Sequence, residues 1–112
     1  MGIDFTRCNA SWSYSGFNRF RESLAKEIGF NLNDFKGFGG KRGWEEMDSG
    51  LKPLLNHSDC DGYLTKRECE LIVPAMKEII KGWDDDYDRQ QAESLIGGME
   101  DVIRNGGRLE FI

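Results

Sequence analysis

Apolar residues recur at helical spacing in three long segments of the chain. The first segment begins after Ser15, a residue type that caps helices, and ends before Gly29, which favours the left-handed conformation that terminates them. Its inward positions, three or four residues apart, are Phe17, Phe20, Leu24 and Ile28. The pattern predicts a helix with one buried face.

Two further helices are predicted in the second half of the chain. Thr65 and Glu68 have the spacing of a capping box, and an apolar face extends from there to Trp83. The last helix begins near the acidic run at 84–88, whose carboxylates suit a helix N-terminus, and continues to about Arg104. A short helix is also predicted at 51–56.

Glycines interrupt the last predicted helix and fill the longest predicted loop. Gly97 and Gly98 each cost about 1 kcal/mol relative to alanine, so we expect another element to approach the helix closely there. Residues 31–44 show neither helical nor strand periodicity, which predicts a loop. Long loops in small domains are often functional.

Apolar and polar residues alternate at both ends of the chain. Residues 3–6 and 109–111 each have the period of a short half-buried strand, and we expect the two strands to pair. The predicted fold class is therefore α+β, mostly helical with about four helices, with a small sheet pairing the N- and C-terminal strands.

The composition indicates one domain, residues 1–112. The chain has 38% hydrophobic residues and a net charge of −5, which suits a small core and argues against binding of extended nucleic acid. No apolar stretch approaches the roughly 20 residues of a membrane span. With no apparent signal peptide and three cysteines, we expect a cytoplasmic protein with reduced thiols and no membrane contact.

One motif has clear chemical content. Residues 57–68 resemble the twelve-residue calcium loop of the EF-hand family, with Gly62 at the sixth position, where that loop turns sharply. A loop and exiting helix of this kind would occupy residues 57–82. The resemblance implies six calcium ligands: His57, Asp59, Asp61, the carbonyl of Tyr63, Thr65 and Glu68.

The first position of this loop departs from the family. His57 stands where the family has aspartate, and imidazole is a poor ligand for a hard cation. The resemblance therefore implies weak or absent Ca²⁺ binding. The alternative is a purely structural turn, in which the aspartates cap and Thr65 and Glu68 form only a capping box.

Zinc is a less favoured alternative for the same region. His57, Cys60 and Cys69, with Cys8 as a distant fourth, are ligand types that zinc accepts. Their spacing does not match that of structural zinc sites. Buried, inert thiols are the competing interpretation.

A second candidate site is an anion-binding loop. Residues 37–43 combine four glycines with Lys41 and Arg42, and their backbone amides could cradle a phosphate, although the spacing is not that of a Walker loop. Charge and base stacking could come from Arg19, Arg21, Trp12, Tyr14 and Trp44. The alternative is an ordinary surface loop.

Most of the chain resembles small proteins encoded in bacteriophage and bacterial genomes. The resemblance is carried by residues 14–17, 19–22, 37–40, 54–62 and 83–88. It implies an accessory role, either binding a host protein or sequestering an anionic small molecule such as a signalling nucleotide. Because His57 is the single histidine and no catalytic constellation is recognisable, we expect a binding or regulatory protein rather than an enzyme.

Overall fold

Four α-helices and two short antiparallel strand pairs are described by the computed structural model, which covers residues 2–57 and 62–112. In chain order the elements are β1 (Gly2–Asp4), β2 (Ser11–Ser13), α1 (Tyr14–Glu27), α2 (Lys52–Leu55), β3 (Tyr63–Thr65), α3 (Lys66–Ile80), α4 (Tyr87–Asn105) and β4 (Arg108–Glu110). Two single-turn 3₁₀ helices, η1 (Leu32–Asp34) and η2 (Trp44–Glu46), lie in the long segment between α1 and α2. The predicted α+β class is confirmed.

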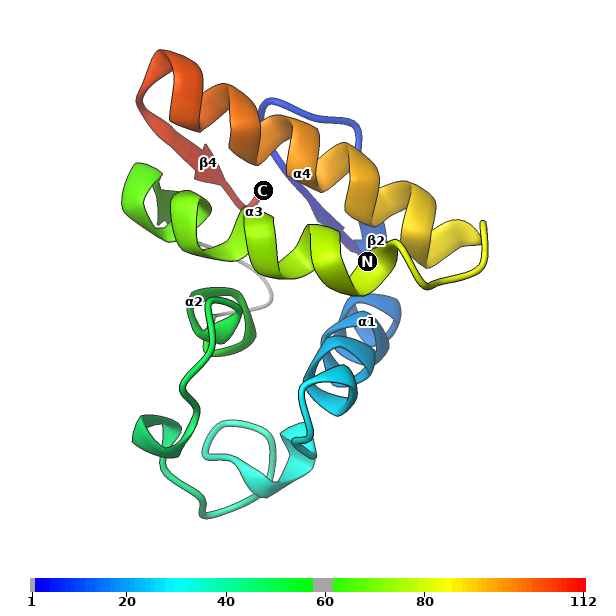
Figure 1. Cartoon of the computed structure of the whole chain (residues 1–112), viewed down its shortest axis with the longest axis vertical. Helices are drawn as coiled ribbons and strands as arrows, with labels where there is room; N and C mark the ends of the chain where they lie inside the picture. Colours follow the sequence, from blue (N-terminus) through cyan, green and yellow to red (C-terminus); the bar gives the residue numbers. More distant parts are fainter. Residues whose placement is uncertain (1, 58–61) are drawn as a thin grey trace.

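The two longest helices, α3 and α4, lie side by side (Figure 1). The predicted capping box at the start of α3 is confirmed, because the Thr65 hydroxyl accepts from the Glu68 amide and the Glu68 carboxylate accepts from the Thr65 amide. Asp86 caps α4 by accepting from the Arg89 amide. The acidic run at 84–88 therefore includes the cap of this helix, Asp86, and extends into its first turn with Asp88.

Helix α1 begins earlier than predicted. Ser13, not Ser15, is its N-cap, and the Ser13 hydroxyl accepts from the Gly16 amide at 3.0 Å. Ser13 is also the last residue of β2, so its extended backbone passes directly from strand to helix. The predicted end is confirmed, because Gly29 has a φ of +84°.

The strands pair mainly with neighbours other than the predicted ones. β1 pairs with β2, and β3 pairs with β4, both antiparallel. The chain ends meet in one antiparallel bridge between Phe5 and Phe111, flanked by the hydrogen bonds from the Thr6 amide to the Glu110 carbonyl and from the Ile112 amide to the Asp4 carbonyl. The expected contact between the termini is therefore present, but over one residue pair.

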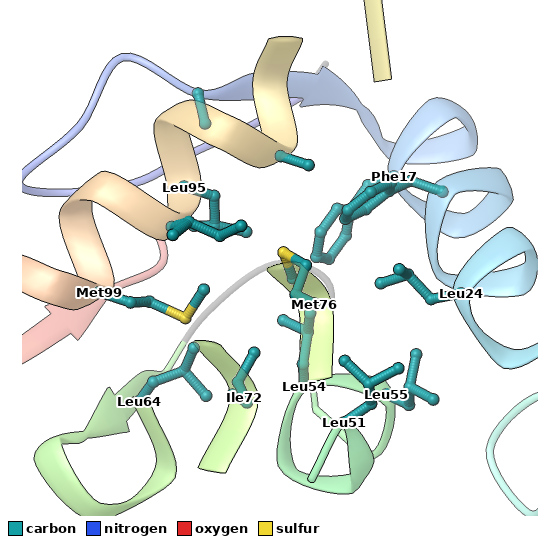
Figure 2. Packing of buried hydrophobic residues seen from close by; sticks show 14 of the residues in the cluster. Phe17, Leu24, Leu51, Leu54, Leu55, Leu64, Ile72, Met76, Leu95 and Met99 are labelled. Atoms are coloured by element: carbon teal, nitrogen blue, oxygen red, sulfur yellow. The ribbon is translucent and has the colours of Figure 1, made fainter. Parts of the chain in front are cut away.

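The core lies between α1, α2, α3 and α4, with Met76 of α3 near its centre (Figure 2). Phe17 of α1 approaches from one side, Leu54 of α2 from below, and Met99 of α4 from the other side. A cluster of aromatic rings continues the core toward the chain termini: Phe5, Trp12, Phe17, Phe20 and Phe111. All of these side chains are buried.

The two glycines of α4 have different surroundings. A Cβ on Gly98 would lie 3.0 Å from the Cys8 Cβ and 3.1 Å from Leu109 Cδ1, so the predicted close approach is confirmed there. At Gly97 a Cβ would meet no described atom within 4 Å, so the same prediction is wrong for that residue. Gly97 lies on the exposed face of the helix.

Candidate functional site

The first and seventh residues of loop 57–68, His57 and Tyr63, are in contact. His57 follows α2, and its Nε2 lies 3.0 Å from the carbonyl oxygen of Tyr63. The His57 ring also stacks on Phe111, with ring centroids 4.0 Å apart. Gly62 has a φ of +94°, as a sharp turn at the sixth position requires. The first and seventh positions of the predicted calcium loop therefore face each other.

The remaining predicted ligands divide into two groups. Asp59 and Asp61 lie outside the described residues. Thr65 and Glu68 are described, and both side chains are engaged in the cap of α3, at 3.2 Å and 2.9 Å. Among residues 2–57 and 62–112, no three His, Cys, Asp or Glu side chains gather closely enough to hold a metal ion.

Pairing with strand β4 fixes residues 63–65 in the second half of the loop. Leu64 lies opposite Leu109 in the antiparallel pair, and both side chains are fully buried. On the outer face, the Arg108 guanidinium lies 4.3 Å from the centre of the Tyr63 ring. The residue whose carbonyl faces His57 is thus held in place by strand pairing and by a cation–π contact.

Arg21 fixes the first residue of the loop, His57. Its side chain is only 2% exposed, and Nη1 donates to the His57 carbonyl at 2.6 Å. The same atom lies 3.4 Å and 3.5 Å from the carbonyls of Leu54 and Leu55, the last two residues of α2. A guanidinium at the negative end of a helix stabilises the unpaired carbonyls there.

The position of Arg21 differs from the sequence-based expectation. We expected this side chain at a surface anion site, but it is buried, with its guanidinium 4.7 Å from the Phe17 ring centre and 5.0 Å from that of Phe38. The helical period contained the signal, because Arg21 is four residues after Phe17 and three before Leu24. Its place on the apolar face of α1 therefore indicated burial.

The two described thiols of the zinc alternative, Cys8 and Cys69, are poorly suited to the metal. Burial, followed by the charge of Glu68, raises the pKa of Cys69 to about 11, and burial also raises the pKa of Cys8. Zinc binds thiolates, so a raised thiol pKa opposes binding. Cys60, the third thiol of the zinc alternative, lies outside the described residues.

The residues of the predicted anion site occupy separate places. Trp12 is buried and stacks on Phe20 at 4.5 Å, while its Nε1 donates to Asp88 at 3.0 Å. Arg19 is exposed and, with Trp12, Asp86 and Asp88, lines a 440 Å³ hollow between α1 and α4. The carboxylates in that hollow do not favour an anion. Tyr14 packs against the core as a partly buried residue.

The other predicted members lie on the glycine-rich segment. The Arg42 guanidinium covers the rings of Phe30 and Phe35 and forms an ion pair with Glu46 at 3.2 Å. Trp44 stacks on Phe35 at 4.6 Å and donates to the Lys36 carbonyl. Arg42 and Trp44 thus contribute to local packing. Of the three residues that this segment was expected to supply to the anion site, Lys41 is the exposed one.

The backbone of the glycine-rich segment is folded on itself. The amides of Phe38 and Gly40 donate to the Phe35 carbonyl, the Lys36 amide to Arg42, and the Arg42 amide to Asp34. These four amides are therefore already used and cannot cradle a phosphate. A Cβ on Gly40 would lie 2.0 Å from the Asp34 carbonyl carbon, which explains glycine at that position.

Comparison of the chain with protein-family models, with curated proteins and with solved structures finds no match in any of the three. Within the described ranges, no helix has the length and apolar character needed to cross a membrane. The site's own geometry is therefore the basis on which a function is proposed.

Proposed function

We propose that this is a small non-enzymatic binding protein built around a divergent EF-hand-like loop at 57–68, which takes up a divalent cation such as Ca²⁺ weakly. The single observation that supports this most is the 3.0 Å approach of His57 Nε2 to the Tyr63 carbonyl oxygen. In an EF-hand loop, positions one and seven ligate the same ion, so they must face each other. Gly62 and the Thr65–Glu68 cap add the turn and the helix start of such a loop.

Internal contacts make the expected affinity low. A cation must compete with the His57–Tyr63 hydrogen bond and with the Glu68–Thr65 hydrogen bond. Imidazole at the first position also replaces a charged oxygen ligand, which lowers affinity for a hard ion. We therefore expect a dissociation constant on the order of 10⁻³ M, the weak end of the range for such loops.

Thermal unfolding with and without calcium tests the proposal. At about ten times the dissociation constant, binding to the native state adds about 1.4 kcal/mol and raises the melting temperature by about 5 °C. Asp61→Ala removes a predicted ligand and should abolish this rise. His57→Asp supplies an oxygen ligand and should increase the calcium affinity about tenfold. Because this variant also loses the His57 contacts, its affinity is judged from the difference between its melting temperatures with and without calcium.

Glu68→Gln is the matched control for the fold. Glutamine at the same position retains an oxygen that accepts from the Thr65 amide, so the cap of α3 persists, whereas the bidentate carboxylate is lost. The melting temperature without calcium should be unchanged and the calcium response absent. If neither wild type nor His57→Asp responds to calcium, the loop is a structural turn and the proposal fails.

The biological setting remains part of the proposal. A cytoplasmic accessory role with a host protein as partner is supported by the charge and cysteine content and by the sequence resemblance to phage-encoded and bacterial proteins.

A further inference from the structure

A hollow of about 530 Å³ lies where the chain turns at the end of α1. The turn is a Schellman motif, in which the Phe30 amide donates to the Ala25 carbonyl at 2.9 Å. The Gly29 amide donates to the Lys26 carbonyl at 3.0 Å, and Gly29 has the left-handed backbone that the motif requires. The turn brings residues 30–32 beside the exposed face of α1, so one wall of the hollow comes from that segment and the other from the helix.

The wall formed by residues 30–32 is largely apolar and fixed in place. The Phe30 ring packs edge-on against Phe35, with ring centroids 5.7 Å apart, and the Arg42 guanidinium lies 4.9 Å from the Phe30 ring centre. Leu32 is buried. The Asn31 side chain caps η1 by accepting a backbone amide through Oδ1 at 3.0 Å, which leaves its Nδ2 as a donor at the hollow. A ligand therefore meets apolar surface that needs no further ordering.

The wall formed by α1 carries two cations. Arg19 and Lys26 are exposed and lie about two helical turns apart on the same face of the helix. Among residues 2–57 and 62–112, no group forms an ion pair or a hydrogen bond with the charged end of either side chain. Glu22 also lines this wall, and its carboxylate accepts from Asn18 Nδ2 at 2.6 Å. Two positive groups and one negative group leave the lining with a formal charge of +1.

We infer that this hollow binds a small organic monoanion, an apolar body that carries a single carboxylate. The apolar wall matches an aromatic or alkyl body, and the two cations match a carboxylate. The volume falls within the range of about 300–1,000 Å³ that is typical of small-molecule pockets. One negative charge suits the site better than two, because Glu27, Asp86 and Asp88 line an adjoining hollow that also contains Lys26.

Naphthoate is the probe, because it has a flat apolar body and one carboxylate, and naphthamide is the same body without the charge. In two-dimensional amide NMR at constant ionic strength, naphthoate should shift the backbone amides of Asn31 and Leu32 and the Asn31 side-chain amide most. We expect a dissociation constant on the order of 1 mM, from about 13 non-hydrogen atoms at the efficiency of drug-sized ligands. Naphthamide should bind about fivefold more weakly, the effect of one charge pair at contact distance in water.

Two variants and a matched control test the role of the cations. Arg19→Gln and Lys26→Gln should each weaken naphthoate binding about fivefold and leave naphthamide binding unchanged. Lys41→Gln removes an exposed lysine that does not line the hollow, and should change neither. Thermal unfolding of each variant checks the fold, because Lys26 lies in the last turn of α1, where a positive charge also stabilises the helix.

Three results would overturn the inference. One is the absence of naphthoate shifts at residues 30–32 up to about 10 mM, where millimolar binding is detectable. The second is equal binding of naphthoate and naphthamide, and the third is an equal effect of the Arg19, Lys26 and Lys41 variants on naphthoate binding. None of the described residues of loop 57–68 lines this hollow, and calcium plays no part in the measurements. Their failure therefore leaves the cation proposal intact.

Discussion

Replacing Gly98 by alanine is expected to destabilise the protein, although the same change inside a helix normally stabilises it. The helix gains about 1 kcal/mol from losing a glycine. The new methyl group would lie 3.0 Å from Cys8 Cβ, 3.1 Å from Leu109 Cδ1 and 3.2 Å from Cys8 Sγ. Favourable carbon contacts begin near 3.5 Å, so neighbours on two elements must shift.

The crowding outweighs the helix gain. Overpacking of a buried site costs about 1–3 kcal/mol, which leaves a net loss of about 1 kcal/mol in the free energy of unfolding for Gly98→Ala. Gly97→Ala in the same helix meets no described atom within 4 Å, so it should keep the full gain of about 1 kcal/mol. The two variants should therefore differ by about 2 kcal/mol in urea denaturation at equal m-value.

A partial rescue tests the cause of the Gly98→Ala loss. Cys8→Ala removes the sulfur at 3.2 Å but keeps the Cβ at 3.0 Å, so it should recover only part of the loss, measured as a coupling energy in a double-mutant cycle. If Gly98→Ala stabilises the protein as much as Gly97→Ala does, the close approach of Cys8 and Leu109 to α4 is wrong.

Two further predictions concern a buried hydrogen bond and a buried thiol. Trp12→Phe removes the donor to Asp88 and should lower the free energy of unfolding by about 1–2 kcal/mol in urea; Asp88→Ala should then cost less in that background than in wild type, and an equal cost would contradict the pairing. The pKa of Cys69 is raised from its ordinary 9.0 to about 11 by burial, so its contribution to stability is complete below pH 9 and is lost as the pH rises through 11. Cys69→Ala should flatten the fall in melting temperature over this pH range, and an unchanged slope would refute the assignment.

The parts of the fold that the sequence predicted correctly are those set by neighbouring residues. The capping box of Thr65 and Glu68 and the left-handed terminator Gly29 each depend on contacts within one helical turn, so local spacing was sufficient. The prediction that Ser15 caps α1 was wrong: the cap is Ser13, and residue type alone does not distinguish two serines. Only the pairing of β2 with β1 shows which serine is still extended.

The candidate sites were less predictable because they depend on contacts between distant segments. Arg21 and Trp12 carry groups that suggested a ligand site, yet both are buried against aromatic rings. Their partners lie far away in sequence: Arg21 bonds the His57 carbonyl, and Trp12 bonds Asp88. A list of basic and aromatic residues contains no information on such pairings, so the structure places the residues of the predicted anion site apart from one another.

Under the proposed function, the contacts of His57 replace those that an oxygen ligand at the first position of loop 57–68 would make. In a calcium-filled loop the ion draws the first side chain and the seventh carbonyl together, whereas here His57 Nε2 lies within hydrogen-bond distance of that carbonyl, at 3.0 Å. Stacking on Phe111 and the Arg21 bond to the His57 carbonyl hold the residue from two other sides. Under the proposed function, we expect these contacts to substitute for part of the binding energy that a metal would supply to folding. His57→Asp therefore exchanges intrinsic stability for cation affinity, and the two quantities should change in opposite directions.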